Sequence, residues 1–112
     1  TPEVNISHRK IPTWERHVAF IESKPYDVWY IAVVEENVVG SIYLTKDSEI
    51  GVFVFREFQG NGHGKKAIDL LMKFHPRKRY LANINPENSK SIGIFEGLGF
   101  RHIQNVYELE GN

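Results

Sequence analysis

Six consecutive residues near the middle of the chain are of types that can hold a phosphate group: Gln59, Gly60, Asn61, Gly62, His63 and Gly64. Three glycines within five residues let the backbone approach a ligand closely and point successive N–H groups in one direction. Because an amphipathic helix is expected directly after them, its free N–H groups and the positive end of its dipole also attract an anion. Lys65 and Lys66, in the first helical turn, oppose that dipole and are unfavourable there without an anion. The segment therefore predicts a phosphate-binding loop rather than an ordinary glycine turn.

Two widespread phosphate motifs do not fit this loop. A Walker loop needs G-x-x-x-x-G-K-[ST], whereas the spacing from Gly60 to Gly64 is one residue short and Lys66 stands where Ser or Thr is required. A dinucleotide fingerprint needs G-x-G-x-x-G and an acidic residue about 20 positions further on. Here the glycines alternate, and residues 77–79 are basic. The motifs H-E-x-x-H and G-x-S-x-G do not occur either, so the sequence has no metalloprotease or serine hydrolase signature.

The elements expected around the loop alternate between strands and helices. Runs of β-branched and aromatic residues predict five strands, at residues 28–34, 38–44, 50–55, 80–84 and 103–109. Apolar residues at helical spacing predict three helices. One begins at Thr13, one follows the glycine loop and stops at Pro76, and one is capped by Asn88 or Ser89. The fold class is α/β or α+β, with a mixed sheet in one domain.

Three local features make further predictions about these elements. Glu36 and Asn37 are expected to form the hairpin turn between the strands at residues 28–34 and 38–44. Gly97 and Gly99 are expected to close the last helix. Gly93, inside that helix, costs about 1 kcal/mol relative to alanine, which predicts a close approach of a neighbour or a ligand.

Length and composition restrict the class of protein. The 112 residues allow one compact domain, and a hydrophobic fraction of 41% is enough for a buried core. The formal net charge is zero, which argues against a dedicated nucleic-acid or membrane-surface binder. The chain has no cysteine, hence no disulfide, thiolate metal site or cysteine nucleophile. Since no apolar run approaches the roughly 20 residues of a membrane span, we expect a soluble, cytoplasmic domain.

Basic residues gather around the glycine loop. Residues 56–79 contain seven basic residues against two acidic ones, a local charge of +5 in a neutral chain. A zone of this kind suits a polyanionic small ligand, and it equally suits a solvated helix face. Both interpretations stay open at this point.

The glycine loop and a second segment resemble the GCN5-related N-acetyltransferase (GNAT) family. The acetyl-CoA motif of that family, [QR]-x-x-G-x-[GA] between a strand and a helix, is matched by residues 59–64. A second family element is an Asn that opens a helix ending in a Tyr-x-x-Leu-Gly-Phe-like sequence, and residues 88–100 resemble it. The resemblance covers residues 30–109. Residues 2–4, and the segment 13–21 with His17, are similar to the subgroup of ribosomal-protein and nucleotide-sugar N-acetyltransferases.

The resemblance implies the acyl-CoA N-acyltransferase fold: a mixed, mostly antiparallel sheet with splayed central strands, flanked by helices. It implies one domain over residues 1–112, with the family's first strand and most of its first helix missing before Thr1. The strand at residues 50–55 is expected to part from that at residues 80–84, leaving a cleft for the pantetheine arm of acetyl-CoA. Backbone groups of Phe53 and Val54 are expected to pair with the pantetheine amides as an added strand would.

The resemblance also assigns contacts to the rest of acetyl-CoA. The pyrophosphate is expected to bind to the loop residues Gln59, Gly60, Asn61, Gly62, His63 and Gly64. His63 is expected to contact it through its backbone rather than its imidazole. Lys65 is expected near the remaining phosphate. Asn88 is expected to hydrogen-bond acetyl-CoA, a role compatible with capping its helix, and Phe95 to pack against the pantetheine or the core.

Acetyl transfer to an amine needs a neutral amine, a polarised carbonyl and a protonated leaving thiol. The resemblance makes Glu49 the candidate base, directly or through water, and a backbone N–H near Val54 the donor to the carbonyl oxygen. The family's acid is a tyrosine whose position is taken here by Phe95, which has no proton to give. We therefore expect either that the thiolate leaves with the help of water or that Tyr107, on the last strand, replaces the missing tyrosine.

The activity implied is an acetyl-CoA-dependent N-acetyltransferase that moves an acetyl group directly to a primary amine. The acceptor is an amino sugar nucleotide, a protein N-terminus or a small amine. The alternative is a non-catalytic acyl-CoA-binding regulatory module. The partners expected are acetyl-CoA as acyl donor and an amine-bearing acceptor, without metal, nucleic acid or membrane. A monomer and a homodimer are both compatible with the sequence.

Overall fold

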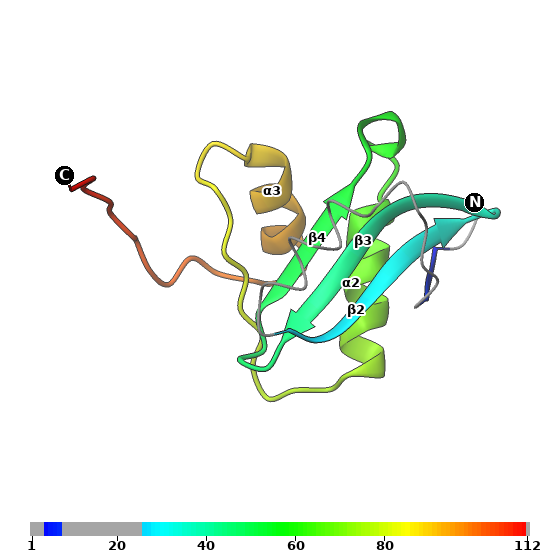
Figure 1. The fold of residues 1–112 in the computed structure, drawn as a ribbon, viewed down its shortest axis with the longest axis horizontal. Coiled ribbons are helices and arrows are strands. Elements are labelled where there is room, and N and C mark those ends of the chain that lie inside the picture. The colour runs from blue at the N-terminus through cyan, green and yellow to red at the C-terminus, as the bar shows by residue number, and fades with distance from the viewer. Residues whose placement is uncertain (1–3, 8–25, 112) are drawn as a thin grey trace.

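The computed structural model describes residues 4–7 and 26–111, and the helix predicted from Thr13 lies outside them. The described residues form a four-stranded sheet in the order β1-β2-β3-β4 (Figure 1). The strands are β1 (Asn5–Ser7), β2 (Tyr26–Val34), β3 (Asn37–Thr45) and β4 (Ile50–Val54). The helical segments are the short 3-10 helix η2 (Arg56–Phe58) and the α-helices α2 (His63–Phe74) and α3 (Ser89–Gly97). The strands predicted at residues 28–34, 38–44 and 50–55 and the last two predicted helices are confirmed.

All three neighbouring strand pairs in this sheet run antiparallel. The turn between β2 and β3 consists of Glu35 and Glu36, whose φ angles are 47° and 70°. Positive φ at both central residues is typical of a type I′ hairpin turn. The predicted turn at Glu36 and Asn37 was one residue too late. Because Val34 pairs with Asn37, only the two glutamates are left to close the hairpin.

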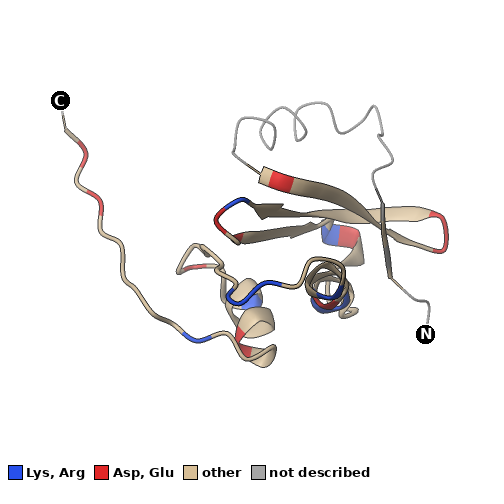
Figure 2. Cartoon of the chain, turned by 90° about the horizontal axis from the view of Figure 1, so that it is seen from below, with Lys and Arg blue, Asp and Glu red and all other residues tan. Residues whose placement is uncertain are grey.

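The two α-helices lie on the same side of the sheet (Figure 2). The residues of α2 that are buried are Gly64, Ala67, Ile68 and Leu71. The helix ends where His75 N–H donates to Leu71 O at 2.9 Å, directly before Pro76, as predicted. Phe74, in the last turn, is 54% exposed. No helix in the described part of the chain is long and apolar enough to span a bilayer.

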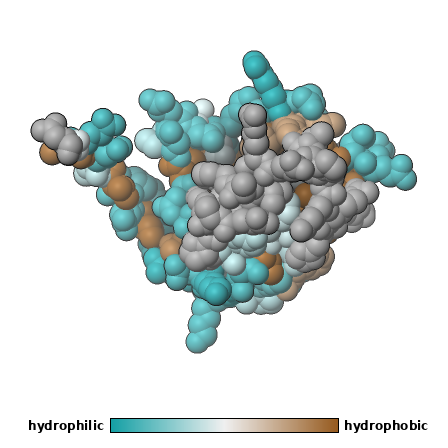
Figure 3. All heavy atoms as spheres, in the orientation of Figure 1, coloured by the Kyte–Doolittle hydropathy of each residue, from teal (hydrophilic) through white to brown (hydrophobic). Residues whose placement is uncertain are grey.

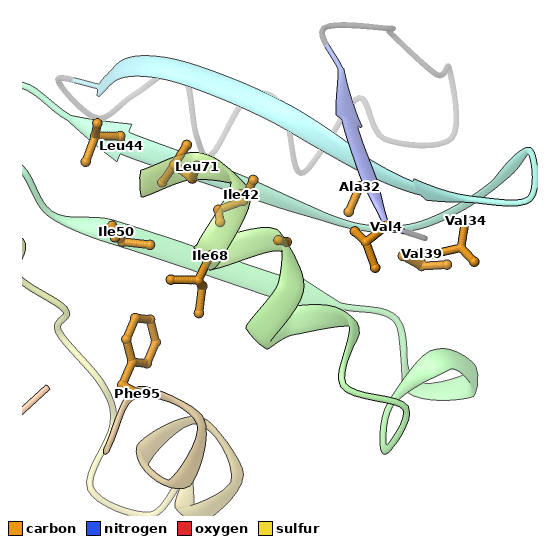
Figure 4. Packing of buried hydrophobic residues seen from close by; sticks show 11 residues of the cluster. Val4, Ala32, Val34, Val39, Ile42, Leu44, Ile50, Ile68, Leu71 and Phe95 are labelled. Carbon is orange, nitrogen blue, oxygen red and sulfur yellow. The ribbon is translucent and has the colours of Figure 1, made fainter. Parts of the chain in front are cut away.

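The main core lies between the sheet and α2 (Figure 4). Ile42 and Leu44 of β3 and Ile68 and Leu71 of α2 are each 0% exposed. Phe95 of α3 is 4% exposed and packs into the same cluster. Full burial of side chains of this size stabilises a fold by roughly 1.5–3 kcal/mol each. The core therefore fixes α2 and α3 against β3 and β4.

A second, smaller cluster contains Trp29 and Ile31 of β2. Ile31 alternates with Ala32, which belongs to the main core, so the two clusters lie on opposite faces of the sheet. Tyr43 of β3 and Phe55 pack against this second cluster.

Both ends of α3 are closed by the residues that the sequence predicted. Asn88 Oδ1 accepts a hydrogen bond from Ser91 N–H at 3.1 Å. At the other end Gly99 has a φ of 98°, Phe100 N–H donates to Phe95 O and Gly99 N–H donates to Glu96 O. This pair of bonds is the Schellman motif, which needs a residue that tolerates the left-handed conformation.

The structure corrects the predictions for the last two strands. Residues 80–84 form only one parallel bridge, between Glu49 and Leu81, and residues 103–109 form no strand. Residues 101–111 run away from the sheet (Figure 1), with brown and teal alternating along them in Figure 3. Ile103 is 54% exposed and Leu109 is 94% exposed. No described strand lies beside this segment, so its backbone has no ladder to join, whatever its strand propensity.

For Gly93, the predicted close approach of a neighbour is not found among the described residues, and the alternative, a ligand, stays a prediction. A Cβ atom built on Gly93 meets nothing within 4 Å. The glycine therefore lies on an open side of α3, and no neighbour in the described structure requires it.

Candidate functional site

The glycine loop connects η2 to α2 at the end of β4. Gly60 and Gly62 have φ angles of 85° and 77°, a left-handed conformation that glycine adopts without a steric penalty. Gly62 is the N-cap of α2, and no side chain caps the helix there. The first N–H groups of α2 therefore lack a side-chain acceptor, which is the arrangement that attracts an anion.

Two amide side chains hold this loop in place. Gln59 Nε2 donates to Val54 O at 3.0 Å and so ties the loop to the end of β4. Asn61 Nδ2 donates to Phe58 O at 3.3 Å. Both bonds are donated by side chains. The Gln59 N–H donates to Arg56 O at 3.3 Å, whereas the N–H groups of residues 60–64 have no backbone acceptor among the described residues.

Basic residues near the loop differ in how they are used. Lys65 and Lys66 are exposed in the first turn of α2. Arg77 instead forms a salt bridge with Asp27 at 2.6 Å and donates to Ser48 Oγ at 3.1 Å. Of these three, only the lysines are therefore in a position to meet an anion at the loop.

The imidazole of His63 does not lie in the cleft described below. It lines a separate cavity of about 290 Å³, together with Glu35 and Asn37 at the hairpin and Lys66 of α2. His63 Nδ1 is buried there and has no hydrogen-bond partner in the described part of the chain. This placement is compatible with the expectation that the backbone of His63, and not its ring, faces a phosphate.

Strand β4 and the segment after α2 are joined at one end and separate at the other. Ile50 N–H donates to Leu81 O at 2.7 Å, and Leu81 N–H donates to Ser48 O at 2.9 Å. Further along, a cavity of about 220 Å³ lies between β4 and the following segment, with Phe53 on one side and Asn83 and Asn85 on the other. The expected parting of these segments is therefore present, although residues 80–84 do not form a strand.

The backbone direction along β4 determines which groups face this cleft. Phe55 N–H donates to Val39 O at 2.8 Å, toward β3, whereas Ile50 N–H points outward to Leu81. Since successive residues of a strand direct their N–H groups to opposite edges, the N–H groups of Val52 and Val54 point outward as well. They lie on the side where an extended ligand can add to the sheet edge.

The cavity is lined by apolar side chains and by short polar ones. The lining residues are Ser41, Tyr43, Ile50, Gly51, Val52, Phe53, Asn83, Ile84, Asn85, Asn88, Ser91 and Phe95. Phe53 is 42% exposed, and its ring meets Phe55 edge-on at 5.4 Å between centroids. Such an open, partly apolar groove with amide groups on its wall suits an extended arm that carries amides of its own.

Two predicted ligand-binding residues lie on the α3 side of the cavity. Asn88 lines it while its Oδ1 caps the helix, so its amide nitrogen is the group left for a ligand. Phe95 lines it as well, and its ring packs edge-on against Phe100 with centroids 5.0 Å apart. Phe95 is thus a core residue that also forms part of the cavity wall.

The two predicted catalytic residues, Glu49 and Tyr107, differ in burial and in their position relative to the cavity. Glu49 precedes β4, is half-buried, and its N–H donates to Thr45 Oγ1 at 3.0 Å. It adjoins Ile50, which lines the cavity, but does not line the cavity itself. Tyr107 is 89% exposed on the segment that leaves the sheet and is not part of the cavity lining.

Sequence reasoning missed five polar residues of the cavity: Ser41, Tyr43, Asn83, Asn85 and Ser91. The strand pattern placed Tyr43 within residues 38–44 but gave no information on which strands flank it. Asn83 lies in the strand predicted at residues 80–84, and Asn85 directly follows it, although Asn is uncommon in strands. Asparagine in a segment with otherwise strand-like composition was the feature of the sequence that could have indicated these cavity residues.

Comparisons with known proteins agree with this geometry. The profile of the Acetyltransferase (GNAT) family matches residues 3–100. An uncharacterised protein of Methanocaldococcus jannaschii, MJ1062, is 30% identical over 109 residues, and the chain spans only 22% of its length. The aminoglycoside N-acetyltransferase AAC(6')-Iy, solved in complex with CoA, superposes with a TM-score of 0.70 at 16% identity, covering 99% of this chain and 96% of that one. The GNAT family protein SP0256 of Streptococcus pneumoniae TIGR4 gives 0.68 at 19% identity, covering 97% and 99%.

An antiparallel sheet that parts beside β4, next to a glycine loop at the start of a helix, defines the acyl-CoA N-acyltransferase fold that these solved structures share. The chain belongs to the acetyltransferase (GNAT) family.

Proposed function

We propose that this chain is an N-acetyltransferase that moves an acetyl group from acetyl-CoA directly to a primary amine. The observation that carries the proposal is the parting of residues 82–85 from β4 beyond the Glu49–Leu81 bridge, with the glycine loop at the far end of the same strand. The chain has no cysteine to carry the acetyl group. Transfer is therefore direct, from the thioester to the amine.

The residues of the cleft fit acetyl-CoA by the chemistry of their donors. The outward N–H groups of Val52 and Val54 supply strand-like pairing for the pantetheine amides, next to Phe53. The left-handed glycines, Gly60 and Gly62, present backbone N–H groups to the pyrophosphate. The exposed Lys65 meets the remaining phosphate, and the amide nitrogen of Asn88 binds from the α3 side.

The carbonyl and the amine need two further groups. A backbone N–H at β4, with Val54 the candidate, polarises the thioester carbonyl from a fixed position. Glu49 is the proposed base. Because Glu49 adjoins the cavity without lining it, the proton passes from the amine to Glu49 through a water.

The acceptor is proposed from the sequence signals and the relatives. Residues 2–4 and 13–21 favour an amino sugar nucleotide or a protein N-terminus, and of these positions the structure describes only Val4. A small amine is the next candidate. The solved relative AAC(6')-Iy adds aminoglycosides to the amines worth testing.

A non-catalytic acyl-CoA-binding module is the second candidate function. Phe95 favours it, because Phe95 brings no proton donor to the cavity wall where a tyrosine was expected. Such a module binds acetyl-CoA but does not release the thiol in the presence of an amine. Thiol release therefore separates the two functions.

The proposed site is tested with a charge pair at the glycine loop. Asp and Asn have nearly the same shape, and both tolerate the left-handed conformation of Gly62. The change Gly62→Asp puts a negative charge at the pyrophosphate position and should weaken acetyl-CoA binding about 100-fold relative to Gly62→Asn, measured by titration calorimetry. Both side chains are good N-caps, so neither variant should melt below the wild type by more than a few degrees.

Equal affinity of the two variants would place the pyrophosphate elsewhere. If the wild type binds acetyl-CoA, thiol release is then measured with amino sugar nucleotides, a peptide with a free N-terminus, simple amines and aminoglycosides. Release that depends on one of these amines supports the enzyme. Tight binding without release from any of them favours the regulatory module.

A further inference from the structure

The cavity beside β4 contains one phenol. Among the described residues that line it, Tyr43 is the only one with a titratable side chain. A phenol can both donate and accept a hydrogen bond. Tyr43 belongs to β3, which lies one strand further into the sheet than β4 at the edge of the cleft. The side chain of Tyr43 therefore has to cross β4 to reach the cavity.

The register of the sheet provides that route. Tyr43 pairs with Trp29 of β2 on one side and with Gly51 of β4 on the other. Trp29 is large and only 8% exposed, whereas Gly51 has no side chain. A Cβ atom built on Gly51 would lie 2.1 Å from Tyr43 Cζ, 2.2 Å from Cε2 and 2.4 Å from the hydroxyl oxygen. The end of the ring therefore lies directly over Gly51, and the hydroxyl is carried across β4 to the cleft.

Two other aromatic residues line the same cavity without a proton to give. Phe53 follows Gly51 on the same face of β4, and Phe95 contributes from α3. Tyr107, the replacement suggested by the sequence, is 89% exposed and outside the lining. Tyr43 is thus the described phenol that shares a cavity with Phe95.

We propose that Tyr43 is a catalytic residue that hydrogen-bonds to the sulfur of the bound CoA and gives its proton to that sulfur when the thiol leaves. This assignment rests on the proposed function. The nitrogen of the neutral amine forms a bond to the acetyl carbon, and the C–S bond breaks with its electron pair going to sulfur. The Tyr43 O–H proton moves to sulfur, and the proton lost by nitrogen goes to the base. The phenolate then regains a proton from solvent.

A titration of bound CoA tests the contact without any acceptor. A phenol that donates to sulfur stabilises the thiolate, so it lowers the pKa of the bound thiol. In Tyr43→Phe, the pKa of bound CoA, followed by the ultraviolet absorbance of the thiolate, should rise by about one pH unit. Tyr107→Phe is the matched control and should leave this pKa unchanged. An unchanged pKa in Tyr43→Phe overturns the assignment, because the hydroxyl then does not contact the sulfur.

Steady-state kinetics adds a second readout, with the amine that supports the fastest thiol release. In Tyr43→Phe, kcat should fall about 100-fold, the lower end of the effect of a positioned acid. The dissociation constant for acetyl-CoA should stay within about twofold, which a merely structural role of the ring would not predict. Retention of the full kcat overturns the assignment.

Failure of the proposed function gives a different pattern. If the folded wild type does not bind CoA, the cleft itself has been misassigned, and the assignment of Tyr43 is overturned together with the proposed function. If wild type and Tyr107→Phe both bind CoA and only Tyr43→Phe shifts the thiol pKa, the phenol is located at the sulfur even where no amine is turned over.

Discussion

At the scale of single residues, Gln59 links the two parts of the candidate site. Its side-chain amide donates to Val54 O at 3.0 Å, so it fixes the loop to the edge of β4 that faces the cleft. The same bond occupies an outward-pointing carbonyl directly beside the Val54 N–H. We therefore propose that Gln59 orients the groups that bind a ligand, in addition to the phosphate contact that the family motif implies.

The change Gln59→Ala should lower the affinity for acetyl-CoA about tenfold, because the loop loses its tie to β4. The free energy of unfolding should fall by less than about 1 kcal/mol, since the lost hydrogen bond is exposed. Calorimetric titration and urea unfolding measure the two effects. Gln104→Ala, at the chain's other glutamine, is the control and should change neither quantity. An affinity equal to that of the wild type would show that the tie does not position the loop.

At the scale of the elements, β3 and β4 lie close together at the end of β4 that precedes the glycine loop. Gly40 pairs with Val54. A Cβ atom built on Gly40 would lie 1.9 Å from Phe53 O and 3.0 Å from Val54 Cα, and both of these are backbone atoms. A side chain at residue 40 would therefore push β4 outward at the positions proposed to hold the pantetheine.

The change Gly40→Ala should destabilise the protein by about 3 kcal/mol, because a backbone atom cannot move aside as a flexible side chain can. Gly93→Ala is the matched control in α3, where an added Cβ meets nothing within 4 Å. It should stabilise the protein by up to about 1 kcal/mol through helix propensity. Urea unfolding of both variants measures these changes. Equal midpoints for the two variants would contradict the close approach of β3 and β4.

At the scale of the whole molecule, the charges are balanced in total and separated in space. The chain is neutral, yet residues 56–79 carry a charge of +5. Arg77 is held in the bridge to Asp27, while Lys65 and Lys66 remain exposed beside the loop. Of these three residues, the two lysines can meet a polyanionic ligand at the loop, whereas Arg77 belongs to the fold.

Acetyl-CoA binding should therefore weaken with salt. Raising the salt from about 50 mM to about 500 mM shortens the screening length severalfold and should lower the affinity about tenfold. In a Lys65→Gln, Lys66→Gln double variant this dependence should be much smaller, and binding at low salt weaker. Titrations at several salt concentrations measure both slopes. The same slope in the wild type and the double variant would mean that the lysines form only a solvated helix face.

The sequence determined the features that depend on neighbours along the chain. β-Branched runs predicted β2, β3 and β4, and helical spacing predicted α2. The caps at Asn88 and Gly99 were also predicted, because hydrogen bonds within a few residues decide them. The glycine loop was found for the same reason, since its backbone angles and the helix that follows it are local properties.

Only the tertiary structure decided the features that depend on contacts across the sheet. Residues 80–84 and 103–109 both have strand-like composition. The first segment forms a single bridge and the second forms no strand, because a strand needs a partner edge to pair with. The position of Tyr43 over Gly51 could not be predicted for the same reason: the two residues are brought together by register. Side-chain alternation places Tyr43 on one face of β3. Only the pairing with β4 puts a glycine beside it, and the ring can extend over that glycine to the cleft.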